Sequence, residues 1–330
     1  MTDQTTLASP LDRLGARLAP QMRRVDALIH ERMASEYAPR IPEVTAHLID
    51  AGGKRVRPLL TVAAAELCGH GGDDHLKLAA TVEFIHTATL LHDDVVDESE
   101  QRRGRPTANL LWDNQSSVLV GDYLFARAFQ LMVEPGSLRV LSILAGAAAT
   151  IAEGEVLQLS AARNLATDEA TYLRVVRGKT AALFQAAAEV GGVVAGAPED
   201  QVRAFATFGD ALGVSFQMVD DWLDYGGAGG AIGKNLGDDF REGKLTLPVI
   251  RAVARADAAE RAFWRDAIER RRGDFERARE IVARRGTLEE TRLEALAWRD
   301  RAQAALGTLP AHPLRDLMDE LAEFVVARAS

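Results

Sequence analysis

The chain has 330 residues, of which 47% are hydrophobic and only 6% aromatic, and its formal net charge is −9. The negative charge argues against nucleic acid as a partner, and the scarcity of aromatic residues favours packed helices over a β-sandwich. Its single cysteine, Cys68, excludes an internal disulfide and suits a reducing compartment.

The N-terminus lacks the basic start and apolar run of a signal peptide. The longest uncharged apolar stretch, residues 140–152, falls short of the roughly 20 residues that span a bilayer. We therefore expect a soluble, cytoplasmic protein.

In chain order, residues 1–20 predict a loose N-terminal arm or a short helix. Beyond them apolar residues recur at helical spacing almost to the C-terminus, interrupted by Gly and Pro clusters. Pro198 suits the first turn of a helix that begins at Glu199, and Thr287 with Glu290 has the spacing of a capping box. Because no linker interrupts the chain, we predict a single all-α domain over residues 1–330.

Two segments carry the pattern Asp-Asp-x-x-Asp within apolar surroundings. They contain Asp93, Asp94 and Asp97, and Asp220, Asp221 and Asp224. On a helix, carboxylates four residues apart share one face and repel each other, and in apolar surroundings they need a cation. An all-oxygen donor set of this kind predicts Mg²⁺ that keeps water ligands and shares a phosphate.

A single acidic pair is often only a helix cap or a solvated surface. We interpret Asp73 and Asp74 in this way, because they lie in a Gly-rich turn. Two copies inside apolar segments favour the metal site instead.

Basic residues accompany both acidic segments. Lys54, Arg55 and Arg57 lie in a Gly-rich turn before a helix, where an anion such as a phosphate is favoured, although alone they could form a solvated loop. The other members of this basic complement are Arg102 and Arg103, which follow the first segment; Lys234 and Lys244, which follow the second; and Lys179 with Thr180 between them.

Together these motifs resemble the trans-prenyl diphosphate synthase (polyprenyl synthetase) family over about residues 50–248, most of all its long-chain octaprenyl and decaprenyl members. Further motifs that carry the resemblance are Gly121-Asp122, Gly178-Lys179-Thr180, Phe216-Gln217 and Gly233-Lys234. The resemblance implies the isoprenoid synthase fold, a bundle of roughly ten or more helices around a central cavity. It also implies a homodimer and transfer of an allylic group to isopentenyl diphosphate.

The resemblance further implies a role for each motif residue. Isopentenyl diphosphate would be held by Lys54, Arg57, His86 and Arg103. The allylic diphosphate would be held by Arg102, Lys179, Thr180, Gln217, Lys234 and Lys244. Three Mg²⁺ ions would be bound by Asp93, Asp94, Asp97, Asp220, Asp221 and Asp224, and catalysis would depend on Lys179 and on all of these aspartates except Asp224. His86 could otherwise be an ordinary core histidine.

The residues before Asp93 bear on product length. Ala88 and Thr89 lie about one helical turn before it, and Ile85 lies farther along the same face. In short-chain relatives the residues at this helix level resemble an aromatic floor beneath the growing hydrocarbon tail, whereas Ala88 and Thr89 are small. We therefore predict a long product, octaprenyl to decaprenyl (C40–C50), for a quinone side chain such as that of ubiquinone, with peripheral membrane contact on release. Phe125, Phe129 and Met132 are candidate floor residues or ordinary core.

Three alternatives remain open. A medium-chain or geranylgeranyl diphosphate synthase would share the motifs. A terpene cyclase would not need a second basic site for isopentenyl diphosphate. A non-catalytic regulatory subunit would carry degraded aspartate motifs, whereas both motifs are intact here.

Overall fold

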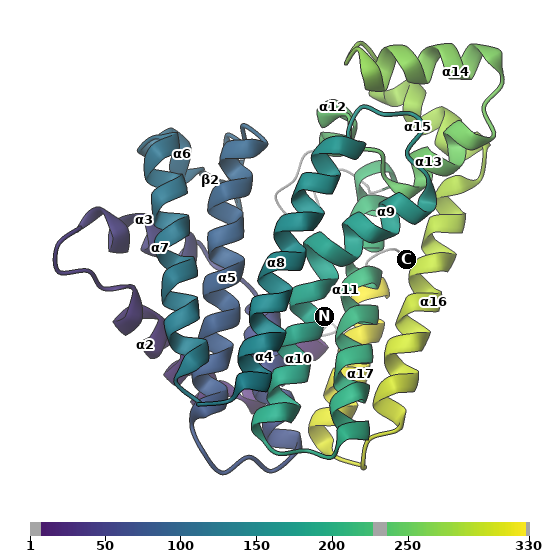
Figure 1. Cartoon of the computed structure of the whole chain (residues 1–330). Helices are drawn as coiled ribbons and strands as arrows, with labels where there is room; N and C mark the ends of the chain where they lie inside the picture. Colours follow the sequence, from purple (N-terminus) through teal and green to yellow (C-terminus); the bar gives the residue numbers. More distant parts are fainter. Residues whose placement is uncertain (1–7, 227–235, 328–330) are drawn as a thin grey trace, which may run out of the picture.

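The computed structural model describes residues 8–226 and 236–327, and these residues are almost entirely helical (Figure 1). The first helices are α1 (Pro10–Arg17), α2 (Ala19–Met33), α3 (Arg40–Ile49), α4 (Val56–Leu67), α5 (Asp74–Val96), α6 (Ala108–Leu111), α7 (Asn114–Val133), α8 (Leu138–Ala161) and α9 (Glu169–Val176). They are followed by α10 (Ala182–Val194), α11 (Glu199–Gly226), α12 (Asp238–Glu242), α13 (Leu247–Ala254), α14 (Ala258–Trp264), α15 (Phe275–Arg284), α16 (Thr287–Gly307) and α17 (Pro313–Ala327). Two π-helical turns, η1 (Arg177–Ala181) and η2 (Arg265–Glu269), and a hairpin of β1 (Gln101–Arg102) and β2 (Arg105–Pro106) complete the described elements. The all-α prediction is confirmed.

Helix α10 lies in the middle of the bundle. It contacts α4, α5, α8 and α11, while α5 also packs on α7 and α11 on α16. Its sequence suits this place, because small residues such as Ala186, Ala187 and Gly191 let neighbouring helices approach closely. The hairpin that follows α5 and the short α12 that follows α11 lie at the same end of the bundle (Figure 1). The ends of the two helices that carry the acidic segments are thereby brought to one side.

The described N-terminal residues are ordered helices. Ser9 and Asp12 form a capping box that starts α1, and Leu11, Leu14 and Leu18 are buried. Helix α1 packs against α17 at the other end of the chain. The loose-arm prediction is therefore wrong for residues 8–20, where the short-helix alternative holds and α2 follows directly.

The predicted helix starts at Glu199 and Thr287 are both found. The predicted capping box at the second is wrong. Gly286 precedes the helix in the left-handed conformation, and the hydroxyl of Thr287 donates instead to the carbonyl of Pro248, at 2.8 Å. Burial of Thr287 against α13 explains the difference.

Helix α8 is longer and more apolar than the sequence reading suggested. By length and composition alone its 24 residues could cross a membrane, although such a helix is weak evidence by itself, and only 28% of its most apolar window is buried. Val156 and Leu159 on this helix are exposed, as are Leu119 and Val133 on the neighbouring α7. These two helices therefore present an uncovered apolar face.

Candidate active site

Both acidic segments occupy the last turn of a long helix. Asp93 and Asp94 end α5, with Asp97 as its C-cap, and the second segment ends α11. Neither last turn contains a basic residue. Because the C-terminal end of a helix carries partial negative charge, carboxylates there are unfavourable unless cations come from elsewhere in the fold.

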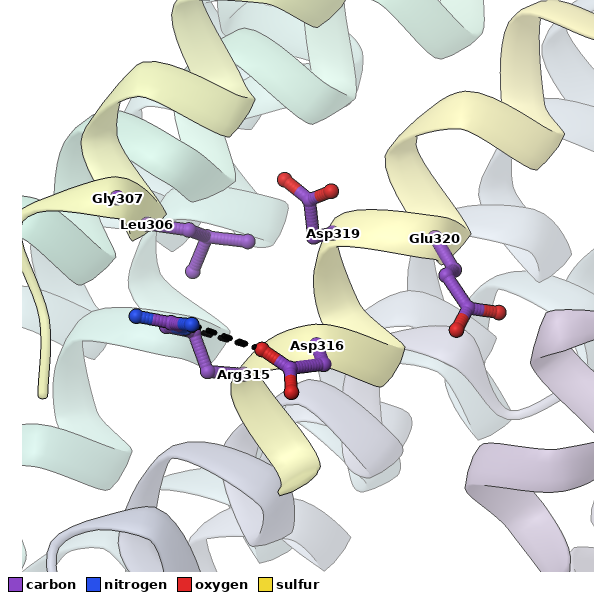
Figure 2. Close-up of a pocket in the computed structure, with 6 residues that line it drawn as sticks. All are labelled: Leu306, Gly307, Arg315, Asp316, Asp319 and Glu320. Carbon is purple, nitrogen blue, oxygen red and sulfur yellow. Dashed lines mark hydrogen bonds and ion pairs between the residues drawn. The ribbon is translucent and has the colours of Figure 1, made fainter. Parts of the chain in front are cut away.

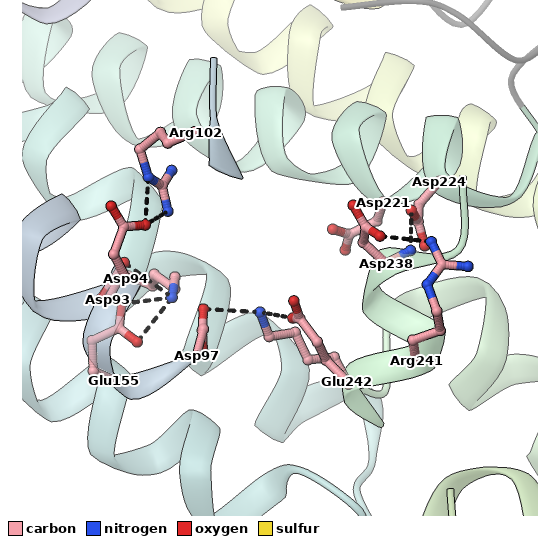
Figure 3. Close-up of polar contacts among 12 residues, drawn as sticks. Asp93, Asp94, Asp97, Arg102, Glu155, Asp221, Asp224, Asp238, Arg241 and Glu242 are labelled. Carbon is pink, nitrogen blue, oxygen red and sulfur yellow. Dashed lines mark hydrogen bonds and ion pairs between the residues drawn. The ribbon is translucent and has the colours of Figure 1, made fainter. Parts of the chain in front are cut away.

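The hairpin supplies the cation for Asp94. Its turn residues Arg103 and Gly104 both have positive φ, so the chain reverses directly after β1. Arg102 thereby donates to Oδ1 of the fully buried Asp94 through Nε and Nη2, each at 2.7 Å (Figure 3). Burial raises the pKa of Asp94, and Arg102 opposes that rise. Oδ2 of Asp94 is buried without a hydrogen-bond partner among the described residues.

Lys179 joins Asp93 to α8. Its ammonium lies 3.4 Å from Asp93 and 2.9 Å from Glu155 (Figure 3). A close crossing of two glycines makes this possible: a Cβ on Gly154 would lie 2.7–2.9 Å from the backbone of Gly178 and Lys179. Lys179 also lies in the π-helical turn η1, a distortion that is frequent at functional sites.

Thr180, the residue after Lys179, is connected to the second acidic segment through Gln217. The hydroxyl of Thr180 donates to Gln217 at 2.8 Å, and the amide of Gln217 donates to Oδ1 of Asp221 at 2.8 Å. The buried Tyr172 of α9 donates its hydroxyl to Oδ2 of Asp221 at 2.7 Å. Burial raises the pKa of Asp221 to about 8, with Asp239 adding to the effect. Both oxygens of Asp221 are thus engaged with the protein.

Asp224 organises the start of α12. Its Oδ1 accepts hydrogen bonds from the backbone amides of Gly237, at 2.9 Å, and Asp238, at 3.1 Å. Gly237 is in the left-handed conformation, so this turn depends on glycine. Asp221 and Asp224 therefore hold the site together, whereas Asp220 is half-buried beside them.

Lys244 connects the first acidic segment to the end of α12. Its ammonium lies 3.3 Å from Asp97 and 2.5 Å from Glu242 (Figure 3). Burial disfavours its charge, but Asp97, Asp239 and Glu242 outweigh that effect and raise its pKa. Asp239 acts on the pKa of both Lys244 and Asp221, which places the end of α5, the end of α11 and α12 around one electrostatic centre.

A second basic group surrounds His86. Burial and the charges of Arg57 and Arg103 lower the pKa of His86 well below its usual value, so the ring is neutral. Arg57 lies over the ring of Phe184, 4.4 Å from its centre to the guanidinium carbon. Lys54 turns toward the C-terminal helix instead, 5.9 Å from the ring centre of Phe324. The structure thus brings three of the four predicted isopentenyl diphosphate residues together.

The small residues before Asp93 lie inside the bundle. Ala88 and Ile85 are fully buried, and Thr89 is half-buried with its hydroxyl donated to the carbonyl of His86 at 2.8 Å. Their role in setting chain length stays a prediction.

The candidate floor residues differ among themselves. Met132 is fully buried, and Phe125 is half-buried with its ring centre 5.9 Å from that of His92. Phe129 does not fit an interior floor, because 45% of it is exposed on α7. Helical spacing alone did not reveal which side of α7 faces the core. Lys234 lies outside the described residues.

The aspartates fit Mg²⁺ by their chemistry. The donors are all carboxylate oxygens, which this hard cation prefers, and the partnerless Oδ2 of Asp94 is a buried acceptor. Over residues 8–226 and 236–327, no three His, Cys, Asp or Glu side chains converge closely enough to hold an ion by themselves. An ion here would need water or ligand oxygens to complete its coordination.

Two surface hollows lie elsewhere. One, between the end of α16 and α17, is lined by Arg315, Asp316, Asp319, Glu320 and two other residues, and contains none of the predicted site residues (Figure 2). Lys54 borders the other hollow, together with Ser9 and Asp12 at the start of α1.

The sequence reading missed several members of the site. Glu155 was detectable as one of two acids in an apolar helix, and Asp239 as part of an acidic pair after a glycine. Glu83, which pairs with Arg55 beside the basic group, was detectable as an isolated acid in an apolar helix. Tyr172 carried no local signal, because its partner Asp221 lies 49 residues away.

Comparisons with known proteins match the chain over most of its length. A family model described as Polyprenyl synthetase matches residues 38–284. The chain is 43% identical over 320 residues to an octaprenyl diphosphate synthase of Escherichia coli (strain K12), covering 96% of this chain and 99% of that protein. It is 42% identical over 318 residues to an all-trans-nonaprenyl-diphosphate synthase (geranyl-diphosphate specific) of Rhodobacter capsulatus, covering 95% and 96%.

Solved structures also match the chain over most of its length. A decaprenyl diphosphate synthase from Rhodobacter capsulatus is 67% identical with a TM-score of 0.95, covering 97% of this chain and all of that one. A polyprenyl synthase from Caulobacter crescentus CB15, complexed with calcium and isoprenyl diphosphate, is 52% identical with a TM-score of 0.92, covering 97% and 98%.

Proposed function

Because the chain belongs to the polyprenyl synthetase family and is a prenyltransferase, we propose that it condenses isopentenyl diphosphate onto an allylic diphosphate, such as farnesyl or geranyl diphosphate. The product is a long-chain all-trans polyprenyl diphosphate of octaprenyl to decaprenyl length. One observation carries the proposal: the adjacent residues Lys179 and Thr180 reach the first and second acidic segments, respectively. Both segments therefore serve one site.

The chain's own cations prepare this site for a diphosphate. Arg102, Lys179 and Lys244 are ion-paired with the aspartates of the first segment. When a diphosphate and its metal bind, these cations can exchange carboxylate oxygens for phosphate oxygens. We assign the allylic diphosphate to this group, and isopentenyl diphosphate to the basic group around Arg57, Arg103 and His86.

Enzymes of this family depend on Mg²⁺, and we propose that three ions bind when substrate is present. Asp93, Asp94, Asp97 and Asp220 would hold them, with Asp221 and Asp224 orienting the second segment. Bound Mg²⁺ supplies positive charge that stabilises the departing diphosphate. Neutral His86 and the two arginines beside it orient isopentenyl diphosphate.

The long product is supported by the absence of aromatic residues at positions 88 and 85, which are Ala88 and Ile85, together with the long products in the names of the similar enzymes. We further propose that the product serves as a quinone side chain, such as that of ubiquinone. The enzyme would be cytoplasmic and would contact a membrane at its surface during product release.

The exposed apolar face of α7 and α8 supports a homodimer. Leu119 is 65% exposed and Val156 64%, an unfavourable state that a second copy would relieve. Light scattering of the Leu119→Arg/Val156→Arg variant should give the monomer mass, while the wild type gives the dimer mass. A monomeric wild type would exclude this assembly.

The activity is tested with purified protein, Mg²⁺, farnesyl diphosphate and labelled isopentenyl diphosphate. Long products should form and should disappear in Asp93→Asn and Asp220→Asn. Asp73→Asn is the matched control, because Asp73 pairs with Arg24 on the surface and should be dispensable. Product from the allylic diphosphate alone would indicate a cyclase, and no turnover without a second chain would indicate a regulatory subunit.

A further inference from the structure

Arg55 is a basic motif residue to which the proposed function gives no role. Its backbone is in the left-handed conformation, with φ of 47°, which is rare for a residue other than glycine. Its guanidinium forms an ion pair with Glu83 of α5, lies 3.4 Å from Asp26 of α2 and donates to the carbonyl of Ile49 at 3.3 Å. Arg55 therefore faces three neighbouring helices and not a substrate.

Glu83 is the buried carboxylate whose negative charge faces the arginines Arg55, Arg57 and Arg103. Its side chain is only 4% exposed, and its charge also acts on Arg57 and Arg103. Burial lowers the pKa of Arg57 to about 10; Glu83 opposes this change and Arg103 adds to it. His86, one turn along α5 from Glu83, adds no positive charge because it is neutral. One buried carboxylate thus offsets the repulsion of several arginines.

The loop before α4, at residues 52–55, holds Arg103 in place. A Cβ on Gly53 would lie 2.9 Å from Nη1 and 3.0 Å from Nη2 of Arg103, so the guanidinium rests directly against the loop backbone. Any movement of the loop at residues 52–55 would therefore displace Arg103 as well as Arg57. The anchor of this loop is Arg55.

We propose that Glu83 and Arg55 are a positioning pair that fixes the loop before α4 and thereby aligns Arg57 and Arg103 on the diphosphate of isopentenyl diphosphate. Neither residue touches the substrate. The inference rests on the proposed function, since it assigns a support to the isopentenyl diphosphate group of that site.

The test measures both Michaelis constants in Glu83→Gln, which keeps the shape of the side chain and removes its charge. The KM for isopentenyl diphosphate should rise about tenfold or more, a loss of about 1.4 kcal/mol in binding. The KM for farnesyl diphosphate should change less than about twofold, because its cations are held by other carboxylates. Arg55→Gly should give the same split, since glycine accepts the left-handed backbone and removes the guanidinium with its contacts to Glu83, Asp26 and Ile49.

Glu260→Gln is the matched control. The side chain of Glu260 is 3% exposed and is likewise bound by arginines, Arg284 and Arg285, but it lies on α14, away from the basic group. This variant should leave both Michaelis constants unchanged. If Glu83→Gln does not fold, Arg55→Gly decides the question.

The inference is overturned if the variants leave the KM for isopentenyl diphosphate within about twofold, or raise both constants alike. A wild-type protein that does not condense the two substrates would overturn the proposed function instead. The two failures are therefore distinguishable.

Discussion

Tyr172 offers the sharpest test of how the second acidic segment is held. Its buried hydroxyl donates to Oδ2 of Asp221 at 2.7 Å, while Gln217 occupies Oδ1. Burial and the charge of Asp221 raise the pKa of Tyr172, so the hydroxyl keeps its proton at any ordinary assay pH. Tyr172→Phe removes this donor and almost nothing else.

The size of the effect follows from the kind of bond. A hydrogen bond to an ionised carboxylate contributes about 1.5–3 kcal/mol, and turnover is therefore measured above about pH 8, the pKa that burial gives Asp221. If that energy keeps the second segment aligned during the reaction, kcat should fall about tenfold to a hundredfold, since about 1.36 kcal/mol corresponds to a factor of ten. The KM for isopentenyl diphosphate should change little, because its arginines belong to other elements.

The assay is steady-state turnover with both substrates varied, together with thermal unfolding with and without Mg²⁺. Tyr123→Phe is the matched control, because its hydroxyl donates to the carbonyl of Ala34 at 3.0 Å, near the surface. This variant should lose that hydrogen bond, and the one that the hydroxyl accepts from Arg127, without losing turnover. A Tyr172→Phe enzyme with kcat within twofold of the wild type would refute the reasoning.

Three further predictions concern the length of the product, the close crossing at Gly154 and Gly178, and the stability of the protein at low pH. Ala88→Phe should shorten the product, as measured by chromatography of the dephosphorylated alcohols, and unchanged length would contradict the tail path along α5. Gly154→Ala should cost about 1–3 kcal/mol of stability and displace Lys179, because the new Cβ meets backbone atoms at 2.7–2.9 Å; chemical denaturation and kcat measure the two effects, and wild-type values for both would disprove the close crossing. Hydrogen bonds from Arg285 and Arg284 lower the pKa of Glu260 to about 2 from its usual 4.5. The stabilisation from ionised Glu260 is therefore present above about pH 4.5 and is lost as the pH falls toward 2. Glu260→Gln should reduce the difference between the melting temperatures at pH 5 and pH 3, and an unaltered difference would contradict this prediction.

Some of the site was predictable because its chemistry is local in the chain. The spacing of Asp93 and Asp97, repeated at Asp220 and Asp224, is a property of five consecutive residues on a helix. The apolar neighbours of these residues are also sequential, so the need for a cation could be inferred without coordinates. The all-α class followed for the same reason, since helical periodicity is read over short windows.

Other features depend on contacts between distant segments. The predicted capping box at Thr287 failed because the hydroxyl found a partner 39 residues away, in Pro248. Phe129 was misplaced because the apolar pattern of α7 covers both a buried and an exposed side. The support of Asp221 by Tyr172 could not be inferred from either residue's neighbours.

The sequence by itself determined the reaction class and the cations and carboxylates that it requires, because each motif is a short run whose members share one helix end or one loop. Only the tertiary structure decided which charge faces which: Lys179 with Asp93 and Glu155, Lys244 with Asp97, and Arg55 with Glu83. These pairings arise where separate helices meet, at glycine crossings and left-handed turns, and their geometry is set by packing.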